Sequence, residues 1–111
     1  MSGDFPESDW KVLRSVKDAA LNRFCERVMD ECRAVMDDRK GTAHERYLRL
    51  FKLIEERDED LSHAFDDMRR SRAVQRISWM RYLDLFADEE WERFSPRTRE
   101  TALFLAGMIS N

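Results

Sequence analysis

Residues 40–45 decide the fold; they read KGTAHE and separate two long segments of helical periodicity. Gly41 is a stop signal for the preceding segment, because glycine readily takes the left-handed conformation found just after a helix. Thr42 and Glu45 have the spacing of a capping box, in which each side chain accepts a hydrogen bond from the other residue's backbone. These residues therefore predict a tight connection between two helices.

On the N-terminal side, an amphipathic pattern runs from about Ser8 to Arg39. Its apolar residues recur at steps of three and four, which places them on one face of an α-helix. The face is wide, and this width indicates contact with more than one neighbouring helix. Its members are Trp10, Leu13, Ala20, Leu21, Phe24, Val28, Cys32 and Val35, broadened by Val12, Val16, Cys25, Met29 and Met36.

On the C-terminal side, a second apolar stripe keeps its phase to about Arg70. Asp58 is its one polar interruption, so we expect a continuous helix, with a break at Arg57–Asp60 as the alternative. A bend or short turn is expected near 70–72, because a single helix that reached Ala87 would be about 67 Å long. The stripe consists of Tyr47, Phe51, Ile54, Leu61, Phe65 and Met68.

Two further helix starts lie near the end of the chain. Residues 88–90 are acidic and can cap a short helix, and Ser95-Pro96 supplies an N-cap followed by proline at the first helical position. After Thr101 the last helix is apolar on nearly every side. We therefore expect it to be buried centrally or against a second subunit. The candidate oligomer interface consists of Phe104, Leu105, Met108 and Ile109.

The composition favours helices throughout. The chain has 111 residues, of which 42% are hydrophobic and 39% charged, and residues 42–95 contain neither glycine nor proline. An all-β fold needs turn residues about every 8–12 positions, so that class is excluded. We predict an all-α, single-domain helical bundle of about four to five helices, two of them long. It occupies residues 8–111, after a flexible segment at 1–7.

The chain shows no targeting or membrane signal. It opens without the basic region and apolar run of a secretory signal, and its longest apolar stretch, at 102–109, is shorter than the roughly 20 residues of a membrane span. We therefore expect a cytoplasmic protein. Cys25 and Cys32 are expected to be free thiols, because about 10.5 Å along one helix separates them, too far for a disulfide.

The sequence offers no catalytic, cofactor-binding or metal-binding pattern. Asp60 and His63 give the nearest approach to a Glu-x-x-His metal motif, and it occurs once. Three scattered glycines cannot form a phosphate-binding loop. We predict a non-enzymatic protein without a cofactor. A ligand-binding pocket lined by Trp10, Trp79 and Trp91 is the alternative.

The charges are sorted along the middle of the chain. Residues 55–67 carry seven acids and one base, whereas residues 69–81 carry five arginines and no acid. On one helix, Arg69, Arg72 and Arg76 would form a stripe with Trp79 beside it. The planar guanidinium suits carboxylate or phosphate. The arginines therefore either pair with the protein's own acids or form a partner-binding or phosphate-binding site, whose candidate residues are Arg69, Arg72, Arg76 and Trp79.

These patterns favour a small cytoplasmic interaction or regulatory protein that binds proteins and forms a homodimer. An acidic stretch followed by a basic one complements itself when a second copy is placed antiparallel. The alternative is a nucleic-acid-associated factor that uses the arginines at 69–76. The net charge of −3 weighs against this alternative, because it gives the chain no field that attracts phosphate.

Overall fold

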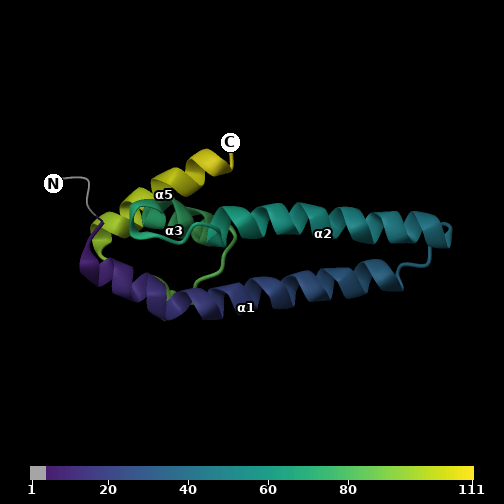
Figure 1. Cartoon of the computed structure of the whole chain (residues 1–111), viewed down its shortest axis with the longest axis horizontal. Helices are drawn as coiled ribbons and strands as arrows, with labels where there is room; N and C mark the ends of the chain where they lie inside the picture. The colour runs from purple at the N-terminus through teal and green to yellow at the C-terminus, as the bar shows by residue number, and fades with distance from the viewer. Residues whose placement is uncertain (1–4) are drawn as a thin grey trace.

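The computed structural model describes residues 5–111, which form helices joined by short loops and contain no strand (Figure 1). The prediction of an all-α fold with two long helices is confirmed. The helices are α1 (Glu7–Asp37), α2 (Ala43–Phe65), α3 (Ala73–Tyr82), α4 (Asp88–Trp91) and α5 (Pro96–Ile109), with a 3-10 turn at Arg70–Arg72.

The connection between α1 and α2 forms as the sequence predicts. Thr42 Oγ1 accepts a hydrogen bond from the Glu45 backbone at 3.1 Å, and Glu45 Oε1 accepts one from the Thr42 backbone at 2.7 Å. This backbone hydrogen bond holds the pKa of Glu45 below its usual value. Gly41 has a φ of +83°, and a Cβ there would lie 2.8 Å from Glu45 Oε1. The capping box and the glycine together turn the chain back on itself.

The second long helix is unbroken but ends earlier than expected. α2 continues through Asp58 to Phe65, so the alternative of a break at Arg57–Asp60 is wrong. The expected turn near 70–72 is present as the 3-10 turn. α2 ends because Asp66 is extended, with a ψ of 150°, and Asp67 then takes a left-handed φ of +53° before the turn.

The start of α1 is tied to the 3-10 turn. The predicted flexible segment at 1–7 lies partly outside the described residues, which begin at Phe5. Glu7 begins α1, and Phe5 packs against the core. The Arg70 guanidinium donates hydrogen bonds of 2.7 and 2.9 Å to the Phe5 carbonyl and one of 2.7 Å to Glu7. These bonds connect residues more than 60 positions apart.

The molecule is elongated, with extents of 58 × 25 × 21 Å and a radius of gyration of 16.6 Å. A compact domain of this length has a radius of gyration of about 13 Å. The excess arises because α1 and α2 form an antiparallel hairpin whose far half extends beyond the other helices (Figure 1). We call this far half, residues 25–56, the arm. The head is the remainder of the described chain, residues 5–24 and 57–111.

The hydrophobic core lies in the head. Every buried apolar side chain among residues 5–111 belongs to it, whereas none of residues 25–56 is buried. α5 packs mainly against α3 and buries only Thr98 and Ala102, so central burial of the last helix is wrong, and its burial against a second subunit stays a prediction. The core residues are Leu13, Val16, Ala20, Phe24, Ala64, Ala73, Ile77, Met80, Leu85, Phe86, Phe94 and Ala102.

A buried carboxylate joins the first helix to the last. Asp9 is 1% exposed and accepts three hydrogen bonds: from the Ser95 backbone at 2.7 Å, from the Ser95 hydroxyl at 2.6 Å and from the Thr98 hydroxyl at 2.6 Å. Ser95 is the N-cap of α5. Asp9 therefore satisfies polar groups at the start of α5 and complements the positive end of that helix.

Two arginines of α1 hold the loop between α3 and α4. Arg23 binds both carboxylate oxygens of Glu90, at 2.7 and 3.1 Å, and donates to the Leu85 carbonyl at 2.7 Å. The hydrogen bond from Arg23 to the Glu90 carboxylate holds the pKa of Glu90 below its usual value. Arg27 donates to the Leu83 carbonyl at 2.8 Å. The loop between α3 and α4 therefore lies against the side of α1 that carries Arg23 and Arg27.

Candidate functional site

The arginines at 69–76 do not form a single helical stripe. Arg69 lies before the 3-10 turn, and its guanidinium is 2.7 Å from a carboxylate oxygen of Asp67. Arg72 is 3.8 Å from the same carboxylate. Arg76, on α3, donates to the His63 carbonyl at 2.8 Å and so caps the last turn of α2. The three arginines do not share one helix, so the stripe predicted from their spacing does not form.

The arginine run is engaged within the chain. The hydrogen bond from Arg69 lowers the pKa of Asp67, and Arg70 binds Glu7. The Arg81 guanidinium lies 4.5 Å from the ring centroid of Trp91, a cation–π distance. The structure thus places each of the five arginines of residues 69–81 against a group of its own chain.

Trp79 lies next to the last helix, apart from Arg69 and Arg72. Its ring stacks on His63 with centroids 4.2 Å apart and meets Tyr82 edge-on at 5.6 Å. An open groove of about 260 Å³ brings Trp79 together with three of the four candidate interface residues. The groove is lined by Gln75, Ser78, Trp79, Leu105, Met108 and Ile109.

The last helix presents an apolar surface to solvent. Phe104 is 70% exposed and Met108 is 60% exposed, whereas Leu105 and Ile109 are half-buried along the groove. The pocket alternative does not form as one cavity, because the three tryptophans pack at separate places against the core of the head. They are Trp10 on α1, Trp79 on α3 and Trp91 on α4.

A second apolar surface lies on the arm, where α2 carries two seams with the alternating three- and four-residue spacing of a coiled coil. The inner seam faces α1 and is half-buried or buried; it consists of Arg46, Leu50, Leu53, Arg57, Asp60 and Ala64. The outer seam consists of Tyr47, Phe51, Ile54, Asp58, Leu61 and Phe65. In the arm, α2 therefore turns Arg46, Leu50 and Leu53 toward α1 and turns Tyr47, Phe51 and Ile54 toward solvent.

The part of the outer seam that lies in the arm is strongly exposed. Tyr47 is 62% exposed, Phe51 51% and Ile54 48%, and the rings of Tyr47 and Phe51 stack with centroids 6.4 Å apart. These are the first three of the six residues of the apolar stripe that the sequence reveals. Side chains of this kind are normally buried, and a contiguous exposed set indicates an interaction site.

Helix α1 contributes to the same surface. Met29 is 54% exposed and Met36 57%, and they are seven residues apart, so they share one side of the helix. Cys25 and Met29 line an open groove of about 170 Å³ together with Ile54, which shows that both helices face the same way there. We call this surface the arm face; it consists of Cys25, Met29, Met36, Tyr47, Phe51 and Ile54.

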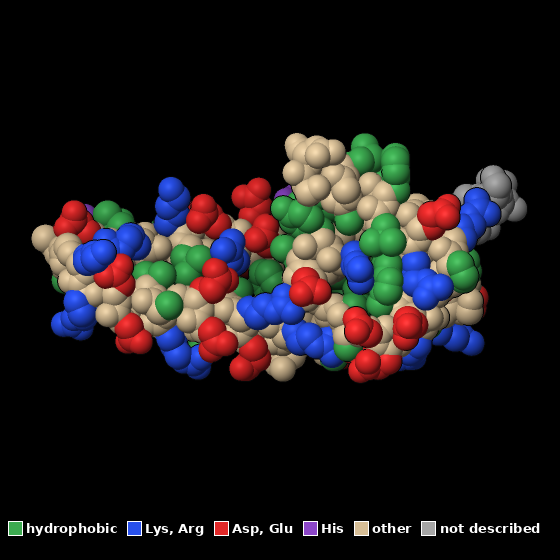
Figure 2. Space-filling model, turned by 180° about the vertical axis from the view of Figure 1, so that it is seen from behind, with side chains coloured by type: hydrophobic (Ala, Val, Ile, Leu, Met, Phe, Trp, Pro, Cys, Tyr) green, Lys and Arg blue, Asp and Glu red, His purple; other side chains and the backbone are tan. Residues whose placement is uncertain are grey.

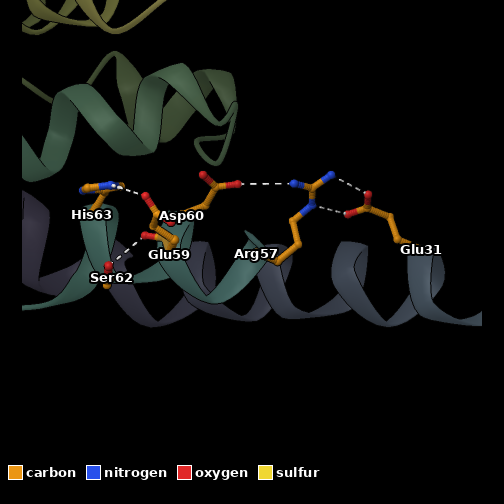
Figure 3. Close-up of polar contacts among 6 residues, drawn as sticks. All are labelled: Glu31, Arg57, Glu59, Asp60, Ser62 and His63. Carbon is orange, nitrogen blue, oxygen red and sulfur yellow. Dashed lines mark hydrogen bonds and ion pairs between the residues drawn. The ribbon is translucent and has the colours of Figure 1, made fainter. Parts of the chain in front are cut away.

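The far side of the molecule from Figure 1 presents hydrophobic side chains along the middle of the arm, between rows of charged ones (Figure 2). Charged groups also hold α1 and α2 together where the arm joins the head. Arg57 binds both carboxylate oxygens of Glu31 at 2.9 Å and lies 3.5 Å from Asp60 (Figure 3). The hydrogen bond from Arg57 lowers the pKa of Glu31. Such half-exposed pairs contribute about 1 kcal/mol or less.

Polar contacts continue along α2 toward the head. His63 Nε2 lies 3.8 Å from Glu59, and the Ser62 hydroxyl donates to the Glu59 carbonyl at 2.7 Å (Figure 3). In residues 5–111, no group of three or more His, Cys, Asp or Glu side chains could hold a metal ion. No helix in the same residues combines the length and the apolar character needed to cross a membrane.

Comparisons with known proteins add no identification. No protein family matches the chain, and no curated protein or solved structure is significantly similar to it.

Sequence reasoning missed two features of the site. The first is Asp9, whose partners Ser95 and Thr98 are more than 80 residues away, so no local pattern reveals them. The second is the exposure of the outer seam. The regular spacing of both seams of α2 was visible in the sequence, and it could have shown that α2 has two faces to cover.

Proposed function

We propose that this chain is a small cytoplasmic helical protein that acts by binding proteins, including a second copy of itself, and we assign it no reaction. The observation that carries the proposal is the arm face, where three aromatic or branched side chains of α2 and two methionines of α1 are about half exposed. Met and aromatic residues are typical of protein-binding surfaces.

The geometry changes the basis of the proposed self-association. Pairing of the acidic stretch at 55–67 with the arginines at 69–81 of a second copy has less support, because those arginines contact groups of their own chain. Apolar burial supplies the driving force instead. An association of this kind persists at high salt, whereas one based on surface charges weakens.

Sedimentation velocity at micromolar concentration, at low and at high salt, tests the proposal. We expect a particle of twice the 13.3 kDa chain mass under both conditions. A monomer at both salt concentrations would contradict self-association. A dimer only at low salt would show that charge pairing, rather than the apolar faces, holds it together.

Nucleic-acid binding is the weaker proposal. The five arginines within residues 69–81 support it. Against it, phosphate would have to compete with Asp67 and Glu7 for two of these arginines, Arg69 and Arg70. If the chain binds RNA or DNA, the affinity falls steeply with salt and with Arg72→Glu combined with Arg76→Glu. Lys11→Glu combined with Lys52→Glu gives the matched change of charge elsewhere. An equal loss of affinity with both pairs of substitutions would show that only the net charge of the chain matters, and not the arginines at 72 and 76.

A further inference from the structure

We infer that the arm face is the self-association surface, and that two arms pack face to face into a four-helix bundle with the heads outside it. This inference depends on the proposed self-association and names the surface that performs it. A second copy of this chain is the occupant to which the structure points, for three reasons that concern area, symmetry and access.

The area of exposed surface fits one missing partner. The chain exposes 7567 Å², whereas a compact monomer of 13.3 kDa exposes about 6,450 Å². The difference is about 1,100 Å². Each partner in a stable protein interface buries about 800 Å². The excess of the whole molecule is therefore large enough to include the share that one protomer contributes to a dimer.

The pattern of the face fits a two-fold interface. Such an interface uses the same patch on both copies, so the patch must be complementary to itself. The arm face is apolar on both helices, and the outer seam of α2 has the spacing by which helices of a four-helix bundle interdigitate. Two hairpins stacked on this face give four helices, each with an apolar seam against another.

The head leaves the face accessible. Arg23 and Arg27, which hold the loop between α3 and α4, precede Cys25 and Met29 by two residues each. Two residues are about 200° around an α-helix. The loop therefore lies on the opposite side of α1 from the arm face, and a second arm can approach without meeting it.

The decisive pair of variants is Phe51→Glu on the arm face and Phe104→Glu on α5. Both replace an exposed phenylalanine with the same charged residue, and neither side chain is part of the core. We expect Phe51→Glu to weaken dimerisation by about 100-fold, because both copies carry the change at the centre of the interface. Phe104→Glu should leave the dimerisation constant unchanged.

The outcomes separate the two proposals. A dimer that resists Phe51→Glu but dissociates with Phe104→Glu would overturn the inference and leave self-association standing. A wild-type chain that stays monomeric would overturn both. The helix content of each variant, measured by circular dichroism, shows that a lost dimer is not a lost fold.

A gain of affinity gives an independent test. Asp58 is the one polar member of the outer seam, and it lines the groove with Cys25 and Ile54. Asp58→Leu should tighten the dimer by about 10-fold, because it removes a charge from the interface and completes the apolar seam. Glu55→Leu, an exposed site outside the seam, is the control. A tighter dimer with Glu55→Leu but not with Asp58→Leu would contradict the assignment.

The thiol of Cys25 reports the contact directly. It is exposed in the single chain and lies on the arm face. Its rate of alkylation, followed on the peptide that contains it, should fall several-fold as the wild-type protein passes from monomer to dimer. In Phe51→Glu the rate should not depend on concentration. A Cys25 rate that stays constant while the wild-type chain dimerises would place the interface elsewhere.

Discussion

The head and the arm are built from the same two long helices, yet only the head has a core. In the head, α1 packs against α2, α3 and the loop that follows α3, and side chains such as Leu13, Ile77 and Phe94 are almost fully buried. Beyond Val28, no contact of α1 within the arm reaches the loop after α3, and no residue of 25–56 is buried. Two helices cannot cover one another on all sides. The head is therefore covered by its own chain, whereas we propose that a second copy covers the exposed side of the arm.

The largest expected effect is the difference in stability between a phenylalanine-to-alanine substitution in the core of the head and the same substitution on the arm. Phe94 is 1% exposed and packs against Phe86 with ring centroids 5.5 Å apart. Phe94→Ala should lower the free energy of unfolding by about 3–5 kcal/mol, because it leaves a cavity in the head. Phe51→Ala should cost less than about 1 kcal/mol in dilute monomer. Urea denaturation at submicromolar concentration measures both, and equal losses would break the comparison.

A smaller effect is expected where the head is closed by polar contacts. Asp9→Ala leaves the Ser95 backbone and the Thr98 hydroxyl without their acceptor inside the protein. We expect a loss of about 2–4 kcal/mol in the free energy of unfolding. Asp18→Ala, on the same helix but exposed, should be nearly neutral. If the two variants unfold at the same urea concentration, Asp9 does not hold α5 to α1.

The smallest effect concerns pH. Arg23 lowers the pKa of Glu90 below its ordinary value of 4.5, so the stabilisation is present above that value. It is lost as the pH falls through the lowered pKa of the folded protein. Between about pH 6 and about pH 3.5, the wild type should lose about 1 kcal/mol more than Glu90→Gln, since Arg23 is partly screened by solvent. Thermal unfolding at both pH values checks this, and parallel losses would contradict it.

Much of the fold could be predicted because its signals are local. The capping box at Thr42 and Glu45 and the Ser95-Pro96 start depend on residues within a few positions of each other. The end of α2 could not be placed so well. It depends on the left-handed Asp67 and on Arg76, which reaches the His63 carbonyl from a different helix.

The candidate site was predicted only in part, for a similar reason. The stripe of Arg69, Arg72 and Arg76 exists only if one helix carries all three, and the chain leaves the helix before Arg69. The apolar stripe of α2 is visible in the sequence. Its exposure is not visible there, because both seams of α2 have the same spacing. The inner seam faces α1, and its Arg57 binds Glu31, a residue 26 positions away in the sequence.

Amide hydrogen exchange at two protein concentrations tests the central claim most directly. If a second copy covers the arm, the amides of residues 43–56 should exchange more slowly at high concentration than at low concentration. The amides of α3 should exchange at the same rate at both. Equal exchange of residues 43–56 at both concentrations, in a sample shown by sedimentation to pass from monomer to dimer, would contradict the account.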